Sequence, residues 1–120
     1  MTKFITGRIR AGGYAFRGAF YLLKNEASIQ VQFVIAILVT IAGFYFGITT
    51  QEWVYQMFAI GLIMTAEGLN TAIEKMADFV HPDFHSKIGY IKDVAAGAVF
   101  IAAVTAVVVG VIIYYPYVFL

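Results

Sequence analysis

Residues 94–117 read VAAGAVFIAAVTAVVVGVIIYYPY, a stretch with no charged side chain and few polar ones. A helix needs about 20 predominantly apolar residues to cross the hydrocarbon core of a bilayer, and this stretch is long enough. Two earlier stretches, residues 29–48 and 53–78, are also apolar over most of their length. The sequence therefore predicts an all-α membrane protein with three transmembrane helices.

The composition of the chain also favours a membrane protein. Of the 120 residues, 62% are hydrophobic and 12% are charged, whereas about one quarter of the residues in a soluble domain are charged. Because the apolar stretches use most of the chain, residues 1–120 are expected to form a single domain. Basic residues and glycines interrupt the start of the chain, so no cleavable signal peptide is expected. The chain has no cysteine, which excludes disulfides and cysteine chemistry.

The N-terminal segment, residues 3–24, is basic and amphipathic. Its basic residues are accompanied by no acidic residue: Lys3, Arg8, Arg10, Arg17 and Lys24. Four of these recur at every seventh position, so on a helix they form one stripe. Phenylalanine and isoleucine alternate with the charges, a pattern more typical of a helix lying on a membrane surface than of a nucleic-acid-binding segment. The glycines of this segment, above all the Gly12-Gly13 pair, predict a break or looseness in the helix, because each glycine costs roughly 1 kcal/mol.

The distribution of basic residues predicts the orientation in the membrane. Most of them lie in the N-terminal segment, and Lys87 and Lys92 follow Pro82 in a polar connection expected to extend to Asp93, whereas the connection before Trp53 has none. Basic residues mark the cytoplasmic side, so the N-terminus and the second connection are predicted to be cytoplasmic. Small residues at every fourth position of the last stretch favour close helix packing: Ala98, Ala102, Ala106 and Gly110.

A row of polar side chains interrupts the second apolar stretch. It consists of Glu67, Asn70, Glu74 and Asp78. Their spacing places all four on one face of a helix. Ionisable side chains inside a membrane are costly, normally face a protein interior or a watery cleft, and mark a function. Mg²⁺ prefers oxygen ligands, so it is a natural partner for Glu74, with Glu26, Lys92 and Asp93 expected at the same membrane depth.

Two other interpretations of this polar row remain open from the pattern alone. The side chains could form interhelical hydrogen bonds, with Lys75 and Lys92 reaching to the membrane surface. They could also form a proton or ion pathway in a small transporter. A nucleotide would not be held by a P-loop, because no GxxxxGK[ST] motif is present. His81 and His85 are spaced like a zinc pair, but Pro82 between them breaks the helix that such a pair needs.

Three motifs resemble the small prokaryotic diacylglycerol kinase family, which also contains the undecaprenol kinases. They are Asn25-Glu26-Ala27, the run AEGLNTAIEKMAD from Ala66 to Asp78, and IKDVAAGAV from Ile91 to Val99. The resemblance covers nearly the whole chain. One departure concerns the lipid side, where Gln30 and Gln32 stand near positions at which the best-known diacylglycerol enzymes carry arginine and glutamate.

The resemblance implies a homotrimer in the bacterial inner membrane, with active sites between subunits. It implies transfer of the γ-phosphoryl group of MgATP to the hydroxyl of diacylglycerol or undecaprenol. By resemblance Glu67 corresponds to the catalytic base, and Glu26 and Glu74 to ligands of the metal and of ATP. The other positions implied to lie near ATP are Tyr14, Asn70, Asp83, Phe84, His85, Lys92 and Asp93.

Overall fold

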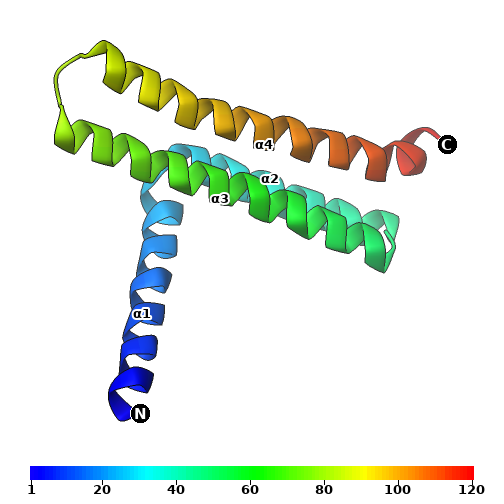
Figure 1. The fold of residues 1–120 in the computed structure, drawn as a ribbon. Coiled ribbons are helices and arrows are strands. Elements are labelled where there is room, and N and C mark those ends of the chain that lie inside the picture. The colour runs from blue at the N-terminus through cyan, green and yellow to red at the C-terminus, as the bar shows by residue number, and fades with distance from the viewer.

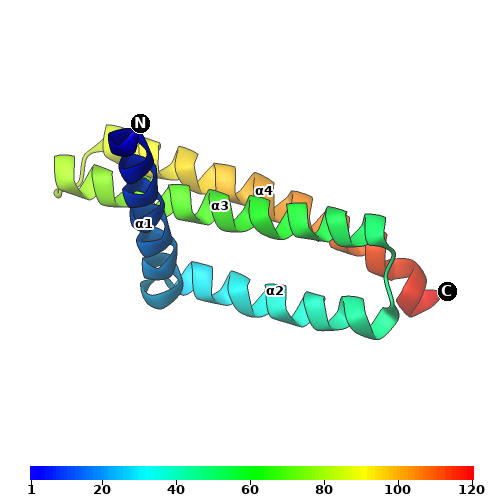
Figure 2. The same ribbon diagram turned by 90° about the horizontal axis from the view of Figure 1, so that it is seen from below.

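The computed structural model describes residues 1–120 as four α helices without a β strand (Figure 1). They are α1 (Thr2–Asn25), α2 (Ala27–Phe46), α3 (Thr50–Val80) and α4 (Ser86–Phe119). Helices α2, α3 and α4 run side by side as an up-and-down bundle in both views (Figures 1 and 2). Helix α1 projects away from the end of the bundle where α2 begins (Figure 1). The all-helical prediction is confirmed.

Two of the four helices, α2 and α4, are long and apolar enough to cross a membrane. Helix α3 has 31 residues but is more polar. Its charged residues are Glu52, Glu67, Glu74, Lys75 and Asp78. The length and composition of α2 and α4 thus suit a membrane protein, while a crossing by α3 stays a prediction.

Very little of the chain is buried within one copy. Only 11 of the 120 residues are buried, and large apolar side chains such as Phe44 and Phe58 are mostly exposed. A water-soluble protein rarely exposes contiguous apolar surface on this scale. The outer faces of the bundle therefore suit contact with lipid or with other copies of the chain.

Helices α3 and α4 form the most extensive contact in the bundle. The small residues Ala77 of α3 and Ala95 and Ala102 of α4 are buried. The small-residue stripe predicted for α4 is only partly at this contact, because Ala98 is exposed and a methyl group added at Gly110 would meet nothing. The seven-residue spacing of Ala95 and Ala102 turns that face of α4 toward α3.

The helix ends differ from the expected ranges by one to three residues at most positions, and two differences are larger. Helix α1 continues through Gly12-Gly13 without a break, so that prediction is wrong, because two glycines alone do not interrupt an otherwise regular helix here. Helix α4 begins at Ser86 rather than after a polar connection reaching Asp93. It starts early because the Nδ1 atom of His85 accepts a hydrogen bond from the Lys87 backbone N–H and caps the helix.

The turn between α2 and α3 is short and well capped. Gly47 ends α2 in the left-handed conformation, with φ of 63°, which only glycine adopts readily. Thr49 and Glu52 form a reciprocal capping box at the start of α3. The Tyr117 hydroxyl of α4 also donates to Glu52 Oε1 at 2.5 Å, and this bond, followed by that from the Thr49 backbone, lowers the pKa of Glu52.

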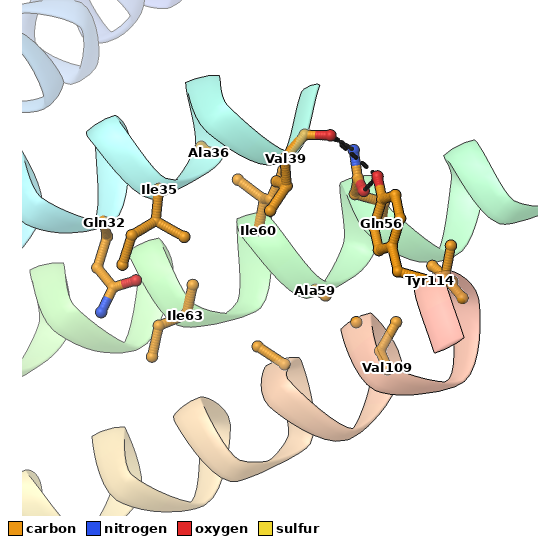
Figure 3. Close-up of a pocket in the computed structure, with 13 residues that line it drawn as sticks. Gln32, Ile35, Ala36, Val39, Gln56, Ala59, Ile60, Ile63, Val109 and Tyr114 are labelled. Carbon is orange, nitrogen blue, oxygen red and sulfur yellow. Dashed lines mark hydrogen bonds between the residues drawn. The ribbon is translucent and has the colours of Figure 1, made fainter. Parts of the chain in front are cut away.

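A polar contact near this turn joins all three helices of the bundle. Gln56 is only 4% exposed, and its Nε2 donates to the Val39 carbonyl at 3.3 Å. The Tyr114 hydroxyl lies 2.9 Å from the same carbonyl and also contacts the Gln56 Oε1 (Figure 3). A cavity of about 90 Å³ lies beside this contact and extends along the bundle to Gln32, which is nearer the other end of α2. The three helices are thus tied together at the end of the bundle that carries the α2–α3 turn.

Replacing Gly43 by alanine is expected to destabilise the bundle. A methyl group at this position would lie 2.6 Å from Trp53 Cη2 and 3.1 Å from Ile48 Cδ1. The indole ring packs against Phe44, with 4.9 Å between the ring centroids, so a shift of the ring away from an added methyl group would disturb this contact. Overpacking of this kind costs about 1–3 kcal/mol. The measurement is the midpoint temperature of thermal unfolding in detergent.

Gly97→Ala is the matched control for this substitution. Gly97 lies inside α4 and nothing lies near an added methyl group, so alanine brings only its better helix propensity. A midpoint for Gly43→Ala at or above that of Gly97→Ala would contradict the close contact between α2 and Trp53.

Candidate active site

The polar row of α3 is divided between a buried and an exposed part. Glu67 is 9% exposed, and Thr71, one turn further along, is 8% exposed. Asn70 is half-buried, whereas Glu74 and Asp78 are exposed. The row thus runs from the interior of the bundle toward the end at which α3 meets the loop before α4.

Asn70 is held by Glu74 and has one free acceptor. Its Nδ2 donates to Glu74 Oε1 at 3.1 Å, which fixes the orientation of the amide. Its Oδ1 is buried and has no hydrogen-bond partner. A buried polar atom without a partner is uncommon and costs free energy, so this oxygen is suited to a ligand that donates a proton or carries positive charge.

Glu26 lies at the break between α1 and α2. It is the only residue between the two helices, with extended backbone angles of φ −103° and ψ 115°. Its Oε1 is 3.6 Å from the Nζ atom of Lys75 on α3. Glu26 and Glu74 are therefore brought to the same end of the bundle, because Lys75 is the neighbour of Glu74 in the chain.

Lys92 and Asp93 lie in the second turn of α4. The Nζ atom of Lys92 is 2.5 Å from Asp78 Oδ1, so this lysine joins α4 to the end of the polar row. Asp93 is exposed and makes no side-chain hydrogen bond or ion pair. Of the two residues, Lys92 is the one that the fold brings to the row through a direct contact.

The loop between α3 and α4 carries Asp83 and His85, both exposed. The Nδ1 atom of His81 donates to the Asp83 carbonyl at 2.7 Å, and His85 caps α4. The two imidazole rings pack edge to face with 5.3 Å between centroids. No three histidine or acidic side chains converge as a metal-binding group anywhere in the chain. These residues shape the loop beside the polar row.

Tyr14 is not brought to the other predicted residues within one chain. It is 60% exposed on α1, and the guanidinium of Arg17, on the same helix, lies 5.7 Å from its ring centroid. Because α1 projects away from the bundle (Figure 1), Tyr14 can reach other site residues only across a neighbouring copy or after a movement of α1.

The structure adds two residues that the sequence-based site lacks. Gln30 donates from Nε2 to the carbonyls of Leu23 and Lys24 at 3.2 and 2.9 Å, which caps the end of α1 across the break. Lys75 contacts Glu26 and lies 5.6 Å from the Tyr21 ring centroid. A polar residue soon after a helix break was the available signal for Gln30, whereas the contacts of Lys75 depend on how α1 and α3 meet.

The oxygen atoms of this region fit a hard divalent cation better than a soft one. The available ligands are the carboxylates of Glu26 and Glu74 and the unpartnered Asn70 Oδ1. Mg²⁺ is usually held by one or two carboxylates together with phosphate oxygens and water. The buried Glu67 lies about 10 Å deeper along the helix than Glu74. The arrangement separates a group suited to proton transfer from groups suited to a metal and a nucleotide.

Comparison with known proteins identifies the family of the chain. The sequence profile of prokaryotic diacylglycerol kinase matches residues 13–114. An undecaprenol kinase of Bacillus subtilis is 32% identical over 116 residues, which cover 97% of this chain and 91% of that protein. A diacylglycerol kinase of Escherichia coli K12 is 30% identical over 107 residues, with 89% and 88% coverage, and one of Haemophilus influenzae is 28% identical over 115 residues, with 95% and 98% coverage. The matched region includes α2, α3, the loop and most of α4, and the chain belongs to the prokaryotic diacylglycerol kinase family.

Proposed function

We propose that this member of a lipid kinase family transfers the γ-phosphoryl group of ATP to the hydroxyl of diacylglycerol or of undecaprenol. The observation that carries the proposal is the buried Glu67 one helical turn from the unpartnered Asn70 Oδ1. These two groups lie deeper in the bundle than the exposed Glu74. A lipid hydroxyl can therefore reach Glu67 from the bilayer while ATP reaches Glu74 from the aqueous side.

In the proposed reaction Glu67 accepts the proton of the lipid hydroxyl. The hydroxyl oxygen forms a bond to the γ-phosphorus, the bond from that phosphorus to the bridging oxygen breaks, and ADP leaves. Phosphoryl transfer depends mainly on positioning and on neutralisation of charge. Bound Mg²⁺ would supply part of that neutralisation, and Glu26, Glu74 and Asn70 Oδ1 are the groups proposed to hold it.

The remaining predicted residues are assigned to the phosphates and the nucleotide. Lys92 would turn from Asp78 toward a phosphate, since an exposed ion pair costs little to break. Asp93 and the loop residues Asp83 and His85 lie on the same side of the bundle, where ATP would approach. Tyr14 would join them from α1 of a neighbouring copy.

We place the chain in the bacterial inner membrane with its N-terminus in the cytoplasm. The start of α2 and the loop after α3 lie at one end of the bundle, joined by the contact of Glu26 with Lys75. Helix α1 runs across the bundle direction (Figure 1), as expected for a surface helix when α2, α3 and α4 cross the membrane. The basic residues of α1 would then face anionic headgroups.

The decisive experiment for the proposed function is a side-by-side assay of the purified chain with MgATP and each lipid. ADP release is expected to require either diacylglycerol or undecaprenol, and the preferred lipid identifies the substrate. The competing ion-transport function predicts no lipid-dependent ADP release. If neither lipid causes ADP release in protein that remains folded, the kinase proposal is overturned.

We further propose a homotrimer whose active sites are shared between copies. One copy leaves most apolar side chains exposed and Tyr14 far from the polar row, so neighbouring copies would supply the missing walls. Mixing inactive Glu67→Gln and inactive Glu26→Gln subunits is expected to restore activity, because some mixed oligomers contain one intact site. Efficient mixing without recovery at any ratio would place each site within one chain.

A further inference from the structure

We propose that Lys75 is a positioning residue that seats the end of α1 on α3 and so holds the Glu26 carboxylate at the candidate active site. The proposal rests on the proposed function, because it assigns Glu26 to the binding of MgATP. It does not require Lys75 to touch the nucleotide.

One ammonium group contacts both the end of α1 and the residue at the break between α1 and α2. The Nζ atom of Lys75 is 3.6 Å from Glu26 Oε1 and 5.6 Å from the centroid of the Tyr21 ring. Tyr21 lies in the last turns of α1, and Glu26 is the break itself. Ammonium groups are attracted both to carboxylates and to the faces of aromatic rings. Lys75 therefore fixes the end of α1 and the carboxylate relative to α3 at the same time.

A second contact places the end of α1 along the same face of α3. Leu22 packs at Gly68, where an added methyl group would be 3.1 Å from Leu22 Cδ1. Gly68 and Lys75 are seven residues apart, so they share a face of α3 and lie about 10.5 Å apart along its axis. Each directly follows one of the two carboxylates of the polar row, Glu67 and Glu74. The contact of α1 with α3 thus runs beside the polar row from Glu67 to Glu74.

Glu26 has no other charged partner. The chain contains one further ion pair, between Lys92 and Asp78. The bonds from Gln30 to the carbonyls of Leu23 and Lys24 set the angle between α1 and α2 but do not reach α3. Without the ammonium group, the Glu26 carboxylate is left at a helix break with only its backbone fixed. Its position relative to Glu74 then becomes variable, which weakens MgATP binding more than the chemical step at Glu67.

The kinetic test compares three variants. Lys75→Met keeps most of the side-chain length without the charge, Lys75→Arg keeps the charge, and Lys87→Met removes an exposed lysine that forms no ion pair or ring contact. Lys75→Met is expected to raise KM for MgATP about three- to tenfold, the scale of one partly exposed ion pair and one cation–π contact. We expect kcat to stay within about twofold, and Lys75→Arg to restore KM.

A second measurement does not depend on activity. Because the chain has no cysteine, Gly18→Cys provides a unique site for a nitroxide label on α1, at a position with open space around it. Lys75→Met is expected to make the label more mobile in electron paramagnetic resonance spectra, and Lys87→Met to leave it unchanged.

The outcomes separate this proposal from the proposed function. If the wild-type protein phosphorylates a lipid but Lys75→Met matches Lys87→Met in both KM and label mobility, the positioning role is wrong and the function stands. A fall in kcat with unchanged KM in Lys75→Met would also overturn the positioning role, because such a result would place Lys75 in the chemical step. If the label responds to Lys75→Met but no lipid is phosphorylated, the seat of α1 is supported and the kinase function fails.

Discussion

Replacing Glu67 by glutamine is expected to lower kcat by about 10²–10⁴-fold, the usual contribution of general acid–base catalysis. Glutamine has nearly the shape of glutamate but cannot accept the proton of a lipid hydroxyl at neutral pH. The affinity for MgATP should change little, because Glu67 is buried whereas the proposed nucleotide ligands include the exposed Glu74. The measurements are kcat with saturating lipid and equilibrium binding of MgATP.

Glu52→Gln is the control for this prediction. It makes the same chemical change on the same helix, in the capping box at the opposite end of α3, and glutamine can still complete such a box. Activity close to wild type is expected for this control. Comparable loss of MgATP affinity in Glu67→Gln and in a variant of Glu74 would contradict the separation of a base from the nucleotide ligands.

Replacing Glu74 by glutamine is expected to raise KM for MgATP about 10- to 100-fold, the scale observed when a metal site loses the support of one charged group. The substitution removes a carboxylate and weakens the hydrogen bond that orients Asn70, so two proposed ligands are affected together. Because the lost interaction involves a cation, a higher Mg²⁺ concentration should restore part of the activity.

The magnesium dependence distinguishes the two carboxylates. Excess Mg²⁺ is expected to raise the activity of Glu74→Gln and to leave Glu67→Gln inactive, since no metal replaces a proton acceptor in the proposed reaction. A Glu74→Gln variant whose activity and KM equal those of Glu52→Gln would exclude Glu74 from the metal and nucleotide site.

Much of the fold could be predicted because hydrophobic length is a strong signal. The apolar stretches and the polar row of α3 follow from residue type and helical spacing alone. The early start of α4 was missed because it depends on one side-chain cap from His85. Continuity through Gly12-Gly13 was missed because glycine propensity is a weak signal.

The carboxylates of the candidate site could be proposed from the sequence, but the contacts around them could not. Costly carboxylates such as Glu67 and Glu74 stand out in an apolar sequence. The seat of α1 joins Tyr21 and Glu26 to Lys75, and the contact of Tyr114 with Gln56 spans 58 positions of the chain. Such pairs depend on how the helices pack against one another, and this packing cannot be read from a single sequence. The unpartnered oxygen of Asn70 is likewise visible only once its neighbours are placed.

The small number of buried side chains in one copy, 11 of 120, has a consequence for how this protein can change over time. Lipid tails are fluid and impose no fixed shape on the side chains that touch them. If α3 and α4 cross the membrane as proposed, then wherever no second copy covers the surface, an exchange such as leucine for Phe58 or isoleucine for Val107 keeps the position apolar and disturbs little. Selection then acts there on composition and helix length rather than on residue identity. Divergence between species should accumulate on the outer faces of the bundle and spare its polar end.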